Sequence, residues 1–285
     1  MREIKRLLNR FYREYNFRER MPQDPIEFPH RYKNPEDIEI AGFIASCFAY
    51  GRVGLFKPVI GRILAIMGGS PHDFLLDFKI KRQGKLFSGI NYRFNKNKDI
   101  VCLIYIISEL FRTHKSIENT FALFYTEDDI DTGHGLTGFI DYILKIDTSG
   151  VYGRDIKPVG FLQFFPSPEK GSACKRMNLF LRWMIRDKDI DFGIWRSIPK
   201  NKLVIPLDTH IARISRCLGF TERKANDWKT AVEITESLKK LDAQDPLKYD
   251  FAMCHHGIAG LCGTKPSGEN AGCKRCIFNQ GSRIN

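Results

Sequence analysis

The sequence predicts an all-α protein, and three observations lead to this fold class. Apolar residues recur at helical spacing through most of the chain, residues typical of helix starts precede these segments, and no alternating strands with hairpin turns follow one another. The chain has 285 residues, of which 43% are hydrophobic and 12% aromatic. This composition is typical of a packed globular protein and excludes a disordered chain.

The first 35 residues are predicted to form a basic amphipathic helix followed by a proline-punctuated loop at 21–35. The arginines of that helix either contact phosphates or form a solvated face. Asn34 and Pro35 are typical of a helix start, and Ser70 marks another. The apolar segments of this half of the chain predict helices over 38–50, 55–67, 100–111, 117–125 and 136–146.

The irregular segment 151–172 is predicted to join two helical lobes of a single unit spanning 1–285. The lobes would cover about 36–150 and 151–285. In the second lobe we expect a helix that begins at Gly171 and Ser172 and runs to 185, and another that begins at Asp208 and ends at Gly219. Further helices are expected to begin at Asn226 or Asp227, and at Asp245 and Pro246, the last burying Leu247, Phe251, Cys254 and Ile258.

The charge balance and the apolar runs restrict the partners and the compartment. Lys and Arg outnumber Asp and Glu by 45 to 33, a net charge of +12, which favours a polyanionic partner. The longest apolar run, 101–107, is far below the roughly 20 residues that span a bilayer, and the N-terminus is too charged for a signal peptide. We therefore expect a cytoplasmic, nucleoid-associated protein whose eight cysteines are reduced thiols or metal ligands.

Asp208, in the stretch VIPLDTHIARISRCLGF, is the first candidate site residue. Its position predicts an N-cap, which typically stabilises a helix by about 1 kcal/mol. The apolar residues around it also predict partial burial, and the helix N-terminus would keep the carboxylate ionised. A fixed, ionised carboxylate can stabilise a developing cation or accept a proton from an amine.

This stretch resembles the Val-Asp-Thr-His signature of helix-hairpin-helix DNA glycosylases. Residues 250–276, DFAMCHHGIAGLCGTKPSGENAGCKRC, are similar to the end of the endonuclease III branch, where a helix ending in His-Gly leads into an iron–sulfur cysteine loop. The similarity covers roughly 165–285. It implies a two-lobed fold with a DNA-binding cleft and a catalytic role for Asp208.

The same resemblance assigns Lys175, in GSACKRMNLF, as the lysine that bifunctional members use. Its separation from Asp208, 33 positions, is closer to that of archaeal 8-oxoguanine DNA glycosylases than to that of endonuclease III. In place of the usual Gly-Val-Gly hairpin this chain has PSPEKGSACK. We expect apolar surroundings to lower the pKa of Lys175, because only the neutral amine attacks the sugar C1′ and forms a Schiff base.

The expected DNA contacts lie near these two residues. His210 belongs to the signature, and such a histidine is also a common structural hydrogen-bonding group. Arginines near a helix start either contact the phosphates beside a flipped nucleotide or are ordinary surface residues. The expected contacts are Gly171, Ser172, Arg176, His210, Arg213 and Arg216.

Cys262, Cys273 and Cys276 are candidate metal ligands with the spacing C-x10-C-x2-C. The family loop is C-x6-C-x2-C-x5-C, so the first gap is longer and the fourth ligand position falls on Ser282. Three interpretations stay open: an iron–sulfur cluster with an unusual fourth ligand, a zinc ion completed by His255 or His256, or a metal-free loop. Any metal here would be structural, and the glycosylase chemistry needs no cofactor.

The sequence as a whole predicts a monomeric DNA repair enzyme that acts on double-stranded DNA. It would excise an oxidised base, 8-oxoguanine above oxidised pyrimidines, and cleave the abasic site through Lys175 and Asp208. A hydrolytic glycosylase, in which Asp208 activates water, is the nearest alternative. A non-catalytic nucleic-acid-binding protein and a regulatory metalloprotein are alternatives from other classes.

Overall fold

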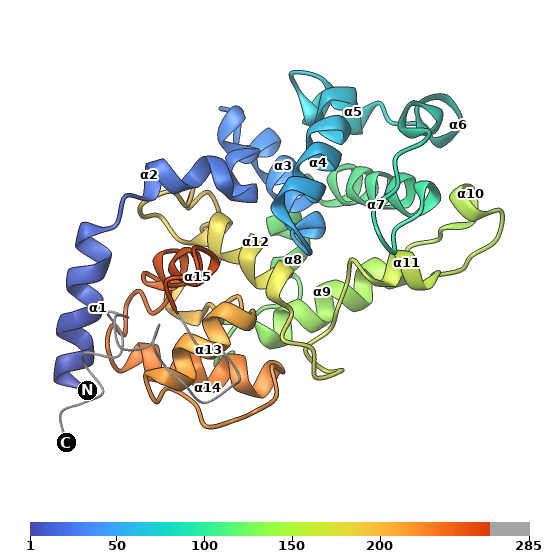
Figure 1. Ribbon diagram of the computed structural model, residues 1–285. Coiled ribbons are helices and arrows are strands. Elements are labelled where there is room, and N and C mark those ends of the chain that lie inside the picture. Colours follow the sequence, from blue (N-terminus) through green and yellow to red (C-terminus); the bar gives the residue numbers. More distant parts are fainter. Residues whose placement is uncertain (263–285) are drawn as a thin grey trace.

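The predicted all-α class is confirmed. The computed structural model describes residues 1–262, and this part of the chain contains helices and no extended strand; two isolated β-bridges pair Tyr92 with Asn95 and Ser172 with Asp227 (Figure 1). The helices are α1 (Arg2–Glu14), α2 (Phe17–Arg20), η1 (Met21–Gln23), η2 (Pro25–Glu27), η3 (Pro29–Arg31), α3 (Pro35–Phe48), α4 (Val53–Met67), α5 (Pro71–Leu76), α6 (Ile80–Gln83), η4 (Gly84–Phe87), α7 (Asn97–His114), α8 (Ile117–Ala122), α9 (Gly133–Lys145), α10 (Ser149–Tyr152), α11 (Val159–Leu162), α12 (Lys175–Ile185), η5 (Lys200–Lys202), α13 (Thr209–Cys217), α14 (Trp228–Lys239) and α15 (Asp250–Ile258).

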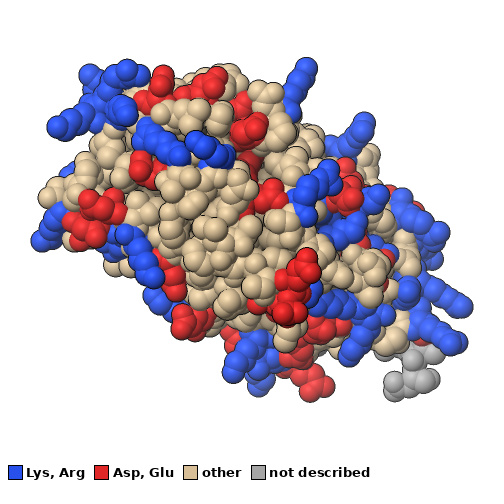
Figure 2. All heavy atoms as spheres, turned by 180° about the vertical axis from the view of Figure 1, so that it is seen from behind, with Lys and Arg blue, Asp and Glu red and all other residues tan. Residues whose placement is uncertain are grey.

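The basic amphipathic helix expected at the N-terminus is α1, and its apolar side packs against α15 and the residue that precedes it. Leu8 is fully buried, and the rings of Phe11 and Tyr12 make edge contacts with His256 and Tyr249. The two ends of the described chain therefore lie side by side (Figure 1). Figure 2 shows lysine and arginine side chains gathered at the edge of the molecule where α1 lies.

The loop expected over 21–35 is instead three short 3-10 helices, η1 to η3, each with a proline in its first turn. Proline presets a helical φ and lacks the N–H that a helix start leaves unpaired, so repeated prolines favour such short turns. Ile26 and Phe28 are buried. This packing fixes the backbone at Asp24, which lies beside the candidate site.

α3 and α12 form the centre of the molecule and join its N-terminal and C-terminal halves. Nearly all of α3 is buried, and at Gly42 an added Cβ would lie 3.0 Å from the Cε of Met184 on α12. The Asn34 side chain, expected to cap α3, bonds no backbone N–H of that helix. The Ser70 hydroxyl does cap α5, accepting from the N–H of Asp73.

The segment 151–172 is less irregular than expected, because it holds the end of α10 and all of α11. α10 crosses the expected boundary at 150, and the lobe assignment 36–150 and 151–285 stays a prediction. Within residues 1–262 no helix combines the length and the apolar character needed to cross a membrane.

Candidate active site

Asp208 is the N-cap of α13, as expected from the sequence. Its Oδ1 accepts hydrogen bonds from the backbone N–H groups of His210 and Ile211, both at 2.9 Å. Ile205 and Leu207 are buried behind it, and the Asp208 side chain is 12% exposed. Gly219, at φ +70°, follows the helix as expected. The cap uses one carboxylate oxygen and leaves Oδ2 for other partners.

Lys175 is the first residue of α12, three positions after the expected start of that helix. The preceding Cys174 has φ +47°, a left-handed conformation that is rare outside glycine, and its thiol donates to the carbonyl of Pro166. Cys174 thus ends the 166–174 loop, and α12 begins at the next residue. Lys175 therefore stands at the exposed end of an otherwise buried helix.

The two residues selected by the signature meet in space. Lys175 Nζ lies 3.4 Å from Asp208 Oδ2, with side chains 37% and 12% exposed. Figure 1 shows α12, α13 and α15 meeting near the middle of the molecule. The pair lines a cavity of about 650 Å³. Its walls also include Gln23, Asp24, Tyr50, Arg52, Phe56, Leu179, His210, Asn226, Cys254 and Ile258.

The charges of the pair stabilise each other. Burial opposes ionisation of Asp208, but the Lys175 charge and the N–H of Ile211 outweigh it and lower the pKa of the carboxyl. Burial likewise favours a neutral Lys175, but the nearby negative charges, that of Asp208 first, together outweigh it and raise the pKa of the amine. The expected lowering of the Lys175 pKa is therefore wrong, and the resting pair is an ammonium and a carboxylate.

Cys254 is a residue of this site that the sequence analysis predicted only on the buried side of its helix. Its thiol donates to Asp208 Oδ2 at 3.5 Å, so the thiol and the Lys175 amine share one oxygen. Burial, followed by the charge of Asp208, raises the pKa of Cys254 well above its ordinary value, so the thiol stays protonated. The only signal for it in the sequence was its place on the helix that ends in His-Gly.

A family model covers the three residues of this site. The model, described as "Protein of unknown function (DUF2400)", matches residues 24–259. The chain belongs to the DUF2400 family. No curated protein and no solved structure matches it. The DUF2400 region includes Lys175, Asp208 and Cys254, whereas α1 and Cys262 lie outside it.

Two of the expected DNA contacts in the DUF2400 region make structural hydrogen bonds. Arg176 is buried, and its guanidinium donates to the carbonyls of Cys47 and Gln163. Arg216 donates to the carbonyls of Arg223, Lys224 and Ala225 and to the side chain of Asn226. Both arginines hold backbone in place. Burial of Arg176 contradicts its expected phosphate contact, whereas Arg216 is half-buried and stays a candidate DNA contact.

The other four expected contacts are partly or fully exposed, and one of them lines the cavity. His210 lines it, and Arg213 Nη2 lies 3.4 Å from His210 Nδ1. Gly171 is exposed at φ +76°, and the Ser172 hydroxyl accepts from the N–H of Cys174. These residues stay candidate DNA contacts.

The cysteine loop lies mostly outside the described residues. Cys273, Cys276 and Ser282 belong to 263–285, so the iron–sulfur and zinc interpretations stay predictions. Cys262 is 6% exposed and lies beyond the end of α15, so it does not share a helix with Cys254. Within 1–262 no group of three or more His, Cys, Asp or Glu side chains is arranged to hold a metal. His255, a zinc ligand in one interpretation, has its Nε2 2.9 Å from Asp24 Oδ2.

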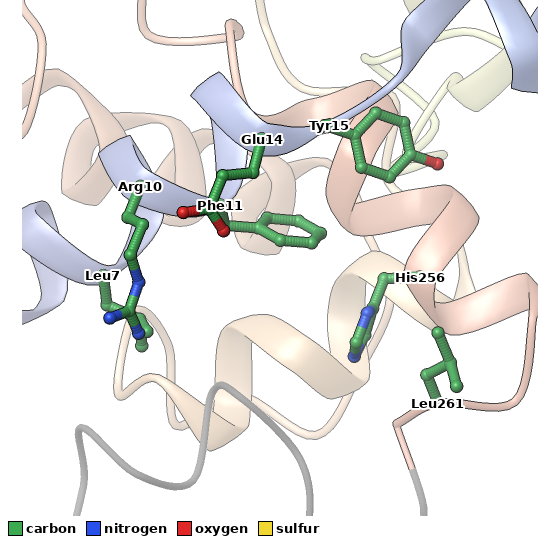
Figure 3. Close-up of a pocket in the computed structure, with 7 residues that line it drawn as sticks. All are labelled: Leu7, Arg10, Phe11, Glu14, Tyr15, His256 and Leu261. Atoms are coloured by element: carbon green, nitrogen blue, oxygen red, sulfur yellow. The ribbon is translucent and has the colours of Figure 1, made fainter.

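A second cavity of about 480 Å³ lies on the other side of α15, against α1 (Figure 3). It is lined by Leu7, Arg10, Phe11, Glu14, Tyr15, His256 and Leu261. His256 faces this cavity, whereas Cys254 and Ile258 face the first one. Because the second cavity has no paired amine and carboxylate, the first is the better candidate for catalysis.

Proposed function

We propose that this protein is a DNA repair glycosylase with abasic-site lyase activity. The observation that carries the proposal is the Lys175–Asp208 pair, 3.4 Å apart in a cavity of about 650 Å³. A lysine and a carboxylate are the two groups that such a reaction needs, and the sequence signature indicates the same two residues. The net charge of +12 further favours a DNA partner.

The reaction begins with the base flipped into the cavity. Cleavage of the N-glycosidic bond leaves positive character on the sugar, which the Asp208 carboxylate stabilises. The Lys175 ammonium gives a proton through Asp208 Oδ2 to the departing base, and the neutral amine then bonds to C1′. Opening of the sugar yields a Schiff base; loss of a C2′ proton expels the 3′ phosphate and nicks the strand.

We further propose the two-lobed helix-hairpin-helix glycosylase arrangement for the fold. The tight turn before α12 supports it, because the N–H of Gly171 bonds the carbonyl of Pro168 at 2.8 Å and the exposed backbone leads directly to Lys175. In this proposal the turn takes the place of the usual hairpin and its backbone approaches the DNA phosphates. We assign an oxidised base as the substrate, with 8-oxoguanine first, because of the 33-position separation of Lys175 and Asp208.

Borohydride trapping tests the proposal directly. The protein is incubated with duplexes carrying an abasic site, 8-oxoguanine, thymine glycol or uracil, and the covalent complex is measured. We expect trapping on the abasic and 8-oxoguanine duplexes, and its loss in Lys175→Gln. Lys145→Gln is the matched control, because Lys145 is an exposed lysine in the last turn of α9 and does not line the cavity.

Asp208→Asn separates the carboxylate charge from its capping role. Asparagine caps helices about as well as aspartate, so α13 should keep its start while the charge at Oδ2 is lost. We expect base release to fall about 100-fold or more. Base release without trapping would instead indicate the hydrolytic enzyme, and binding with no activity that responds to Asp208→Asn would indicate a non-catalytic DNA-binding protein.

A further inference from the structure

The two oxygens of Asp208 have different partners. Oδ1 is used by the backbone N–H groups at the start of α13. Oδ2 faces the cavity, with Lys175 Nζ at 3.4 Å and Cys254 Sγ at 3.5 Å. The amine and the thiol come from different helices, α12 and α15, and converge on one oxygen.

Cys254 is a neutral hydrogen-bond donor at this position. Its surroundings hold it as a thiol, which has one proton to donate. The thiol of Cys174, in contrast, donates to the carbonyl of Pro166 and does not line the cavity. The Cys254 side chain, unlike that of Cys174, points toward the Asp208 carboxylate.

We propose that Cys254 is a positioning residue of the reaction, whose thiol holds Oδ2 of Asp208 toward the cavity and weakens the hold of that oxygen on the Lys175 ammonium. This inference rests on the proposed glycosylase–lyase function. It adds a third group to the pair, one that touches neither the sugar nor the base.

The thiol has an effect at two steps of the reaction. Before attack, Oδ2 divides its lone pairs between two donors, so the ammonium loses its proton more readily than it would beside an unshared carboxylate. After attack, the lysine nitrogen is bonded to C1′ and carries the positive charge, and Oδ2 still has one donor. The thiol then keeps the carboxylate oriented toward the cavity without drawing in a water molecule.

Other charged and titratable groups also act on this cluster. Asp24 also lines the cavity and raises the pKa of Lys175, as a charged Cys254 thiolate would, and His210 lowers the pKa of Asp208. Asp250 acts on Cys254 from one turn earlier in α15. A test must therefore compare variants that leave these three groups unchanged.

The experiment compares wild type with Cys254→Ala, Cys254→Ser and Cys102→Ala. Cys102 is a buried cysteine of α7 and does not line the cavity, so its variant controls for loss of a buried thiol. Two quantities are measured from pH 6 to 10.5: the rate of borohydride trapping on an abasic duplex, and, without DNA, the rate at which fluorodinitrobenzene labels Lys175. The thermal unfolding midpoint of each variant reports on folding.

We expect Cys254→Ala to move both pH profiles to higher pH by about half a unit, the effect of removing one neutral hydrogen bond from a carboxylate. Cys254→Ser restores an O–H donor and should return both profiles toward wild type, whereas Cys102→Ala leaves them in place. A residue with a packing role alone would lower the unfolding midpoint without moving either profile.

The two proposals fail in different ways. An unmoved labelling profile in Cys254→Ala contradicts the role of Cys254, whether or not trapping is seen. Absence of trapping in wild type contradicts the lyase function, and the labelling profile still decides whether the thiol acts on Lys175. The inference is also overturned if the pH profile of Cys254→Ser coincides with that of Cys254→Ala. The lost hydrogen bond would then not be the cause of the shift.

Discussion

Gly257 of α15 lies directly against His210 of α13, and a Cβ at Gly257 would come within 2.7 Å of the His210 Cβ. Real Cβ atoms do not approach so closely, so the helices that carry Cys254 and the Asp208 cap pack together only because this residue is glycine. The His-Gly that resembles the endonuclease III branch thus has a packing reason in this chain.

Gly257→Ala is expected to destabilise the protein by about 1–3 kcal/mol, because the new methyl group must push α15 away from His210. Urea unfolding measures the change. Gly54→Ala is the control: Gly54 is a residue of α4 with no atom near its would-be Cβ, and alanine there should be neutral or slightly stabilising. Equal unfolding midpoints for the two variants would mean that α13 and α15 separate at no cost.

The pH dependence of trapping should follow the raised pKa of Lys175. A raised pKa means that the ammonium persists to higher pH, so the trapping rate on an abasic duplex should still be rising in the alkaline range. Asp208→Asn removes the charge that raises this pKa, so its profile should shift to lower pH by more than Cys254→Ala shifts it upward. A profile that stays at the wild-type position in Asp208→Asn would contradict the ion pair.

The Lys175–Asp208 pair also makes the free energy of unfolding depend on pH. The directions of the two pKa shifts give the sign of that dependence. Asp208 has a lowered pKa, so its contribution is present above the pKa of the unfolded chain and is lost as the pH falls through the folded value. Lys175 has a raised pKa, so its contribution is present at neutral pH and is lost as the pH rises through its folded value. The stability contributed by the pair is therefore greatest around neutral pH.

Local sequence signals predicted three helix starts correctly. Asp208, Asp227 and Ser70 each cap a helix with their own side chain, because capping depends on residues only two or three positions apart. Lys175 and Asp208 could be paired before the structure only through a family signature. No spacing rule predicts that Lys175 Nζ and Asp208 Oδ2, at the starts of two separate helices, lie 3.4 Å apart.

The features that the sequence did not predict depend on contacts between residues far apart in the chain. Arg176 looks like a surface arginine in the sequence, but it is buried and bonds the carbonyl of Cys47, 129 positions away. α15 begins at Asp250 and not at Pro246, and Ile258, expected on its buried side, is 50% exposed. The contact of Cys254 with Asp208 joins residues 46 positions apart. The direction of the Lys175 pKa shift likewise needed the distance to a charge.

Glu39 gives a prediction about stability away from the site. This buried carboxylate of α3 accepts hydrogen bonds from the N–H groups of Ile117 and Glu118 and from Trp195 Nε1 at 2.6 Å. Burial outweighs these bonds and raises the pKa of Glu39 to about 7. A carboxyl with a raised pKa stabilises the fold fully at low pH and loses that contribution as the pH rises through its folded value.

Between pH 4.5 and 7 we therefore expect Glu39 ionisation to reduce the free energy of unfolding by about 3 kcal/mol at most. Urea unfolding of wild type and Glu39→Gln at pH 5 and pH 7.5 measures the difference between their pH dependences. Glu127→Gln, at an exposed carboxylate, serves as the control. Parallel pH dependences in wild type and Glu39→Gln would show that its three hydrogen bonds already satisfy the anion.

α1 gives a prediction about DNA binding. Its apolar side is used against α15, so it is not available to a membrane or a partner helix, and its basic side chains face outward. The exposed basic residues are Arg2, Lys5, Arg6, Arg10 and Arg13. Each phosphate contact releases condensed counterions, so contacts made by this surface must appear in the salt dependence of the affinity.

The variant Lys5→Gln/Arg6→Gln/Arg13→Gln is expected to reduce the slope of log affinity against log salt concentration by about 2 to 3. Trapping at saturating protein should be unchanged, because none of these residues lines the Lys175 cavity. Lys81→Gln/Arg82→Gln/Lys85→Gln removes the same charge from exposed positions of α6 and η4, at the opposite end of the molecule (Figure 1). Equal slopes for the two variants would mean that α1 contributes net charge alone; a smaller slope only in the α1 variant places the phosphate backbone along this helix.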